Sequence, residues 1–395
     1  MRATIPALAG VALLAAVAAP AHAQDRLTGA AVASGGVVYE QWRSSLSLGT
    51  ASELSVPLAV VVPLGDRWTV DGYGAYVRGT LTAPRELGSG RTTLNGLTDV
   101  KLRAVGQLRG DALVLTLGVN VPTGATKLTA DEQGVLAVLA APALRFRAPA
   151  VGTGAGATVG LVTGHQARGW ALAAGASFEA RGKYAPAEAL VAGVDAPELT
   201  PGNAVHLSLA ADRVAGQSRT TFSVIGDVFT AGRVGDAAGS LAYRPGPAVT
   251  AAWQTQLGTR RAATTIYAVE RYRSGYTVGG ASAANSARNE LEGGVQLAAT
   301  RSPALTLRAT VDGRLHSAAA GGAASIASGL GADAATITTA GIRAAGLTLG
   351  ASYRLGRSAA SLEPFVRAQA GRLDFRSATA NATGVGAGLS LSARF

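Results

Sequence analysis

The stretch that decides the fold is residues 385–395, which read Val-Gly-Ala-Gly-Leu-Ser-Leu-Ser-Ala-Arg-Phe. Every second residue from Val385 to Phe395 is apolar, and the residues between them are Gly, Ser or Arg. Because successive side chains of a β-strand point to opposite faces, this alternation predicts a strand with one apolar face and one small or polar face.

The same stretch resembles the terminal strand of bacterial outer-membrane proteins, which ends in Phe and is read by the barrel-assembly machinery. The resemblance implies that Phe395 is an assembly signal and that this machinery is a partner. The physical reason for such a strand is closure. In lipid, a sheet has to pair its last strand with its first, since unpaired backbone groups cannot be satisfied there.

The other end of the sequence predicts export. Arg2 is followed by the apolar run Ile5–Ala19 and by the small triplet Ala21-His22-Ala23, which is the order of a secretory signal. The apolar run is shorter than the roughly 20 residues that a membrane-spanning helix needs. The predicted organisation is a signal peptide over 1–23, cleaved after about Ala23, a flexible lead over 24–36, and one outer-membrane β-barrel over 37–395.

Composition supports a membrane barrel over other classes. Hydrophobic residues make up 48% of the chain and charged residues only 15%, against roughly 25% charged in average soluble domains. No other long apolar stretch is present, as expected when apolar and polar residues alternate. The formal net charge is +11, but no dense Lys/Arg tract points to nucleic acid. There is no Cys, and we expect no cofactor.

One hairpin shows the strand pattern in the interior of the chain. Over 97–108, Asp99, Lys101 and Arg103 fall on one face, and the residues between them are mostly apolar. The turn 109–111 follows, and a second alternating run covers 113–121. Neither run has the i, i+3, i+4 spacing of a helix, so the pair predicts a β-hairpin.

Repeating this test along the chain predicts an all-β, antiparallel transmembrane barrel of about 16 strands, with 14 as the alternative. The predicted strands are 37–48, 53–63, 67–80, 97–108, 112–122, 152–164, 169–182, 203–212, 219–230, 247–257, 262–273, 288–299, 304–316, 346–355, 360–373 and 383–395. Short connections, such as 109–111, alternate with long ones, namely 81–95, 123–134, 183–202, 231–246, 275–287 and 317–343. We expect the short turns in the periplasm and the long loops outside the cell, where lipopolysaccharide and other outer-membrane lipids are the expected contacts.

A second resemblance lies in the same hairpin. Gly96-Leu-Thr-Asp99-Val-Lys-Leu102, followed by Leu115-Thr-Leu-Gly118 and Pro122-Thr-Gly124, resembles a pattern of phenol meta-pathway and FadL-like transporter barrels. The resemblance covers about 30 residues. It implies uptake of small hydrophobic or aromatic molecules. The N-terminal plug of that mechanism has no counterpart in this sequence.

Charged residues on the predicted inner face are the candidates for function. The candidates for lining the lumen are Asp99, Lys101, Arg103, Glu290, Glu292, Arg308, Asp312, Arg314, Arg354, Glu363 and Arg367. With Asp212, Asp227 and Arg394, acids and bases are equal in number, at seven each. Because a buried charge needs a partner, this balance predicts ion pairs inside the barrel.

Catalysis and metal binding have little support. The predicted mature chain has only His165, His206 and His316, and no His/Cys cluster suggests a metal site. His206 and Ser208 share an inward face, but no third orienting group can be named. The sequence therefore predicts a non-enzymatic channel or transporter that works by passive diffusion of a small solute. The alternative is a closed structural or adhesive barrel.

Overall fold

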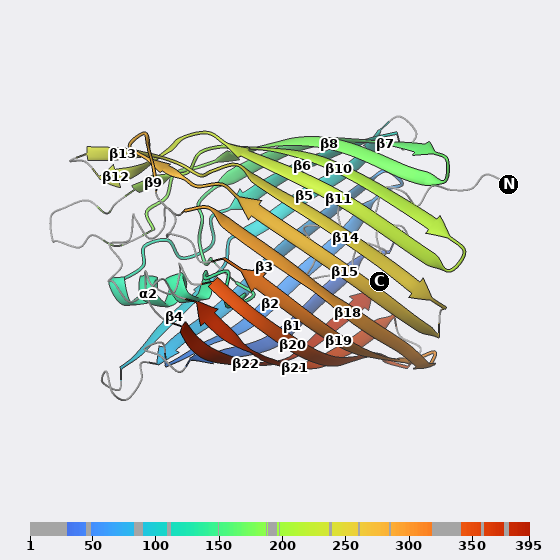
Figure 1. Cartoon of the computed structure of the whole chain (residues 1–395). Helices are drawn as coiled ribbons and strands as arrows, with labels where there is room; N and C mark the ends of the chain where they lie inside the picture. Colours follow the sequence, from blue (N-terminus) through green and yellow to red (C-terminus); the bar gives the residue numbers. More distant parts are fainter. Residues whose placement is uncertain are drawn as a thin grey trace.

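The chain folds as a closed, antiparallel β-barrel with one helix in the described part (Figure 1). The computed structural model describes residues 30–44, 49–82, 90–108, 112–148, 150–186, 188, 196, 198–236, 239–259, 261–283, 286–317, 341–356, 359–374 and 379–395. The predicted signal peptide lies outside these residues. No helix in the described ranges is long and apolar enough to cross a membrane.

Sixteen strands form the barrel, since β4 and β5 both pair with β3 and act as one interrupted strand. The barrel strands are β1 (Val32–Ser44), β2 (Thr50–Leu64), β3 (Trp68–Thr82), β4 (Arg91–Leu97), β5 (Val100–Leu108), β6 (Leu113–Val121), β7 (Gly156–Ala167), β8 (Trp170–Arg181), β10 (Ala204–Ala215), β11 (Ser218–Phe229), β14 (Ala248–Gly258), β15 (Ala262–Arg273), β18 (Arg288–Ser302), β19 (Leu305–His316), β20 (Gly341–Arg354), β21 (Ala360–Asp374) and β22 (Thr379–Arg394).

The barrel closes between its first and last strands. β1 pairs with β22 from Val32 opposite Arg394 to Ser44 opposite Ala382. Ala31 N donates to Phe395 O at 3.1 Å, and Phe395 N donates to Ala31 O at 3.0 Å. Closure pairs the edges that an open sheet would expose to lipid.

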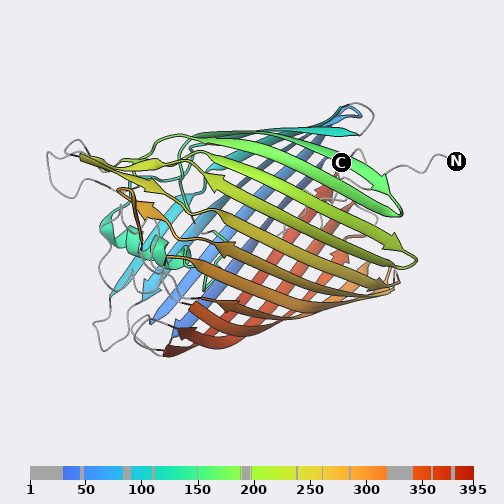
Figure 2. The ribbon, with the colours of Figure 1, turned by 45° about the horizontal axis from the view of Figure 1, so that its top comes forward.

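Alternation in the sequence decides which side chains face lipid. On β22, Val385, Leu389 and Leu391 lie on the outer face, each about half exposed, and the glycines and serines between them face inward. The same period places Leu102, Leu117 and their equivalents outside on the other strands. The strands run obliquely to the barrel axis on both walls (Figure 2), as in membrane barrels generally.

The two ends of the barrel differ. One end, here called the short-turn end, carries tight connections such as 65–67 and 168–169. The other, the long-loop end, carries a small sheet of β9 (Glu198–Thr200), β12 (Gly232–Asp236), β13 (Gly239–Arg244), β16 (Thr277–Val278) and β17 (Ala281–Ser282). The ranges predicted as loops over 183–202, 231–246 and 275–287 therefore contain strands, which are too short to show a clear period in the sequence.

The sixteen-strand prediction is confirmed, with shifts at several boundaries. β1 begins at Val32, so residues 32–36 of the predicted lead belong to the barrel. β7 begins at Gly156 instead of 152, and β20 begins at Gly341 instead of 346. The largest difference concerns the predicted loop 123–134. It contains α2 (Ala130–Leu139), and it leads into a segment that folds into the lumen.

Candidate functional site

The residues between β6 and β7, 122–155, are here called the inserted segment. They fold against the inner wall of the barrel at the long-loop end (Figure 1). Its helix α2 starts at a capping box, in which Thr129 Oγ1 accepts from Glu132 N and the Glu132 carboxylate accepts from Thr129 N. α2 lies directly on β3 at Gly79, where a Cβ would approach Leu139 Cδ1 to 2.5 Å. A side chain at this position would force Leu139 and Val135 to shift, so glycine lets the helix pack closely on β3.

The two ends of the inserted segment meet at Asp99, in the break between β4 and β5. The Asp99 carboxylate accepts hydrogen bonds from Gly124 N at 3.0 Å, Asn120 Nδ2 at 3.0 Å, Thr153 N at 2.6 Å and Thr153 Oγ1 at 2.8 Å. Gly124 follows β6 and Thr153 precedes β7, so one side chain joins the point where the segment leaves the wall to the point where it returns. We call this arrangement the neck.

The Pro-Thr-Gly stretch at 122–124 now has a physical explanation. Thr123 Oγ1 donates to Thr98 O and accepts from Val100 N, each at 3.0 Å. A Cβ at Gly124 would lie 2.0 Å from Val151 O, because the outgoing and returning chains cross there. The sequence pattern that resembles a transporter motif is thus the neck of the inserted segment.

The inserted segment crosses the lumen. Leu139 contacts β3, whereas six residues later Arg145 forms an ion pair with Glu292 on β18. Around the ring the order is β3, β2, β1, β22, β21, β20, β19, β18, so β18 is seven steps from β3 in a ring of sixteen and nearly opposite to it. Arg145 reaches this position with φ of 53°, in the left-handed region that non-glycine residues rarely adopt.

The half of the lumen behind the segment is filled toward the long-loop end. Leu144 and Phe146 belong to a buried cluster with Trp42 of β1, Ile342 of β20 and Leu373 of β21. The Glu53 carboxylate of β2 accepts from Ala148 N at 3.2 Å, and the Arg147 guanidinium stacks 5.2 Å from the Phe365 ring. On this side the inner face toward the long-loop end supports the segment and is buried, whereas Arg308 and Glu363, toward the short-turn end, are 38% and 29% exposed.

The other half, from β5 to β15, keeps solvent-accessible side chains. The inward residues Thr158, Ser177, Ser208 and Thr250 are small and partly exposed. The inward Lys101 of β5 is exposed. Trp42 on the filled side is 4% exposed by comparison. The accessible part of the inner face toward the long-loop end therefore lies on the wall from β5 to β15, and the space between this wall and the inserted segment is here called the passage.

Ion pairs on the inner face present arginine more than carboxylate. The Arg145 side chain is 34% exposed and that of its partner Glu292 is 6% exposed. Arg103 and Asp71 are 34% and 17% exposed, and Arg219 and Asp212 are 34% and 12% exposed. Three pairs depart from this trend, since their two partners are about equally exposed, namely Arg181 with Glu179, Arg367 with Asp312 and Arg288 with Glu290. The accessible surface of the passage is consequently more positive than the balanced charge count suggests.

The candidates predicted from the sequence face inward, and several are brought together. Arg308 pairs with Glu363 at 3.5 Å and Arg367 pairs with Asp312 at 2.8 Å. Glu292 receives Arg145, Arg271 at 3.4 Å and His316 at 3.2 Å. Glu290 lies 3.9 Å from Arg288. Lys101 and Arg103 lie on β5, across the barrel from the candidates on β18 to β21, and Arg354 is exposed toward the short-turn end.

Three candidates are buried on the inner face. Asp99 is 4% exposed at the neck, Glu292 is 5% exposed beside Arg145, and Arg314 is 5% exposed against the Trp42 ring, 5.1 Å from its centre. Alternation gives the face of a strand, but it does not reveal that another segment covers that face. Phe395 is 74% exposed on the outer face, and its role as an assembly signal stays a prediction.

Sequence reasoning missed several inner charges. Asp71 and Glu53 lie on predicted strands, and the period-two rule finds them when it is applied to every strand. Arg145 and Arg147 lie in a stretch without a strand period, so nothing local marks them as inward. His206 Nδ1 lies 2.7 Å from Asp227 Oδ1. No cluster of three or more His, Cys, Asp or Glu that could hold a metal is found in the described ranges.

Comparison with known proteins adds the fold alone. No family model matches the chain, and no curated protein matches it significantly. Solved structures similar to it include OccK1 of Pseudomonas aeruginosa (10% identity, 92% of this chain and 99% of that one, TM-score 0.46) and the CymD monoaromatic hydrocarbon channel (9%, 93% and 88%, 0.43). An anion-selective porin from Comamonas acidovorans is also similar (8%, 92% and 99%, 0.38). These are channels of the outer-membrane barrel type, and the FadL-like resemblance is not confirmed.

Proposed function

We propose that this protein is a passive diffusion channel of the outer membrane for small solutes, with a preference for anions. The observation that carries the proposal is the inserted segment, which crosses the lumen from β3 to β18 and leaves the wall from β5 to β15 accessible. A segment that narrows a barrel without filling it sets a size limit, which is what a diffusion channel needs.

The charge of the narrowed region supports the anion preference. Arg145 stands at the crossing, and Arg271 is 31% exposed beside the buried Glu292. Inside a barrel, low-dielectric walls focus the field of such side chains on the water between them. Exposed arginines with covered carboxylates therefore favour a negative solute where the inserted segment crosses the lumen.

The solute class is narrower than the sequence predicts. The transporter resemblance implies small hydrophobic or aromatic molecules, whereas the inner face combines arginines with the aromatic residues Tyr73 and Tyr267. Small organic anions, including aromatic carboxylates, match both properties. Neutral hydrophobic molecules gain nothing from the exposed charges. The proposal assigns no catalytic role to the barrel.

The test is a single-channel recording in a planar bilayer under a KCl gradient. We expect discrete conductance steps and a reversal potential of the sign that marks chloride as the more permeant ion. Arg145→Glu should lower the preference for chloride, because it reverses the charge at the crossing. The matched control is Arg213→Glu, on the outer face against Trp170, which should leave the reversal potential unchanged. A cation-selective wild type would contradict the anion preference.

The closed barrel stays the second candidate, and one observation favours it. The Arg145–Glu292 ion pair and the buried cluster behind it fix the inserted segment in place. Absence of any conductance, together with no entry of benzoate into liposomes that carry the protein, would favour this reading and overturn the channel.

A further inference from the structure

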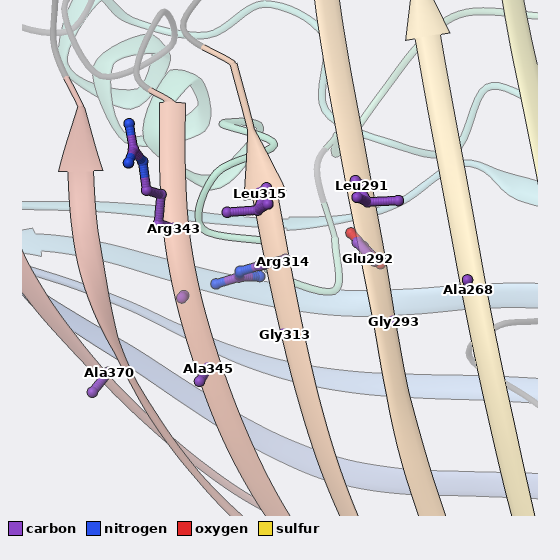
Figure 3. A pocket seen from close by; sticks show the side chains of 11 residues that line it. Ala268, Leu291, Glu292, Gly293, Gly313, Arg314, Leu315, Arg343, Ala345 and Ala370 are labelled. Atoms are coloured by element: carbon purple, nitrogen blue, oxygen red, sulfur yellow. The ribbon is translucent and has the colours of Figure 1, made fainter.

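The outer face of the barrel has a groove across five strands. A cavity of about 550 Å³ opens there, lined in part by Leu291, Leu315 and Arg343 (Figure 3). Its floor is a single row of cross-strand partners, Ala268 of β15, Gly293 of β18, Gly313 of β19, Ala345 of β20 and Ala370 of β21. None of these five residues has a large side chain, so the lipid-facing surface is hollowed along the whole row.

Larger side chains border the groove on both sides. Toward the long-loop end, Leu291 and Leu315 are 45% and 52% exposed on the outer face. Toward the short-turn end, the next outward residues include Val295 and Leu347, which are similarly exposed. Five adjacent strands with a spacing of about 4.8 Å make the groove roughly 19 Å long. Because the strands are oblique to the barrel axis, the groove also runs obliquely, and its length is comparable to an acyl chain that spans one leaflet, about half of a 30 Å hydrocarbon core.

Two arginines stand at the β20–β21 end of the groove. Arg343 and Arg372 are direct cross-strand partners on the outer face, and both are exposed. Like charges in directly opposite positions destabilise a sheet unless an anion lies between them. Asp374 accepts from Arg343 Nε at 3.1 Å and offsets one of the two charges, which leaves a net positive charge beside the apolar groove.

We propose that this groove binds the phosphorylated lipid anchor of lipopolysaccharide. One acyl chain would lie over Gly293 and Gly313, and a phosphate would bind Arg343 and Arg372. The apolar groove matches the acyl chain of such a lipid, and the arginine pair at its end matches the phosphate. The site lies on the lipid side of the wall, so it is independent of whether the lumen conducts.

The experiment measures retention of purified lipid A by the refolded full barrel in micelles, by native mass spectrometry. Arg343→Ala with Arg372→Ala should weaken retention roughly tenfold or more, since charge-assisted hydrogen bonds are lost. Gly313→Leu should weaken retention of lipid A but not of its deacylated form. A Cβ at Gly313 meets no atom closer than 3.8 Å, so this variant fills the groove without disturbing the wall.

The control variant is Arg91→Ala, an exposed outward arginine on β4, six strands from β20 around the ring. It should retain lipid A as the wild type does. Heat-dependent gel mobility verifies that each variant is folded, and single-channel conductance should be unchanged in all of them. Equal retention by the double variant and the wild type would overturn the proposal. Equal retention of phosphatidylglycerol by the wild type would also overturn it.

Discussion

At the scale of single residues, Asp99 shows how one side chain can fix a large structure. Its carboxylate receives donors from both ends of the inserted segment while it is almost fully buried. A buried acceptor of this kind stabilises the fold through each hydrogen bond that it accepts, and its removal leaves the donors unpaired. The position of the inserted segment therefore depends on a residue that is outside the segment.

We expect Asp99→Asn to loosen the neck. The amide keeps the size of the side chain but loses the charge. Its NH₂ group is a donor and would face another donor, Gly124 N or Thr153 N. This mismatch should destabilise the neck by about 2 kcal/mol or more. Hydrogen exchange should become faster over 124–155 and stay unchanged in the barrel strands. Asp66→Asn, in an exposed turn, is the control. Unchanged exchange at 124–155 would show that the neck does not depend on this carboxylate.

Arg145 combines an uncommon backbone conformation with an ion pair. Its left-handed φ costs about 1–2 kcal/mol for a residue with a Cβ and far less for Gly. Both Arg145→Ala and Arg145→Gly lose the ion pair, so their difference isolates the backbone. We expect the Gly variant to be more stable by about 1 kcal/mol in denaturant unfolding of the refolded barrel. A less stable Gly variant would mean that the residue does not hold this conformation.

Whether a residue borders the passage could be predicted only in part. The period-two pattern places Arg308, Arg354 and Arg367 on the inner face, because strand geometry leaves only two choices. It gives Asp99, Glu292 and Arg314 the same status, although all three are buried. Burial on an inner face depends on what else enters the lumen, and no local pattern contains that information.

At the scale of elements, strands were predictable and the inserted segment was not. Each strand carries its own lipid-facing row, so β15 is predicted over 262–273 and found there. α2 does have a local signal, the Thr129–Glu132 capping box ahead of an apolar run. The path of the segment across the lumen is decided by contacts with β2, β3 and β18, which are distant in sequence.

Removing the inserted segment should widen the passage. Residues 125 and 152 approach closely, with 2.6 Å between Ala125 O and a Cβ at Gly152, so a short Gly-Ser link can replace 127–149. The β6–β7 pairing lies outside the deletion and should hold the barrel together. Conductance should rise on the order of twofold, because the segment runs from β3 to β18 and separates about half of the ring from the accessible wall. Thermal stability should fall, since Val77 and Leu94 lose their apolar cover. Unchanged conductance would show that the segment does not limit the passage.

At the scale of the whole molecule, closure and charge act together. The sequence predicts sixteen strands because each adds the same alternating pattern, and the pairing of β1 with β22 completes the ring. A balanced count of inner charges suggests a neutral, plugged lumen. The fold changes that interpretation, because it covers carboxylates such as Glu53 and Glu292 more than the arginines.

This asymmetry predicts how selectivity depends on salt. Exposed charges act over the Debye length, which is about 10 Å at 0.1 M and about 3 Å at 1 M salt. If the arginines along the passage set the anion preference, the chloride-to-potassium permeability ratio should fall toward that of free solution as the mean KCl concentration rises from 0.1 to 1 M. The pore itself stays the same size, so the cutoff for neutral sugars in liposome swelling should not change. A permeability ratio that stays constant over this range would mean that selectivity arises at a contact too close for salt to screen, such as direct binding at Arg145.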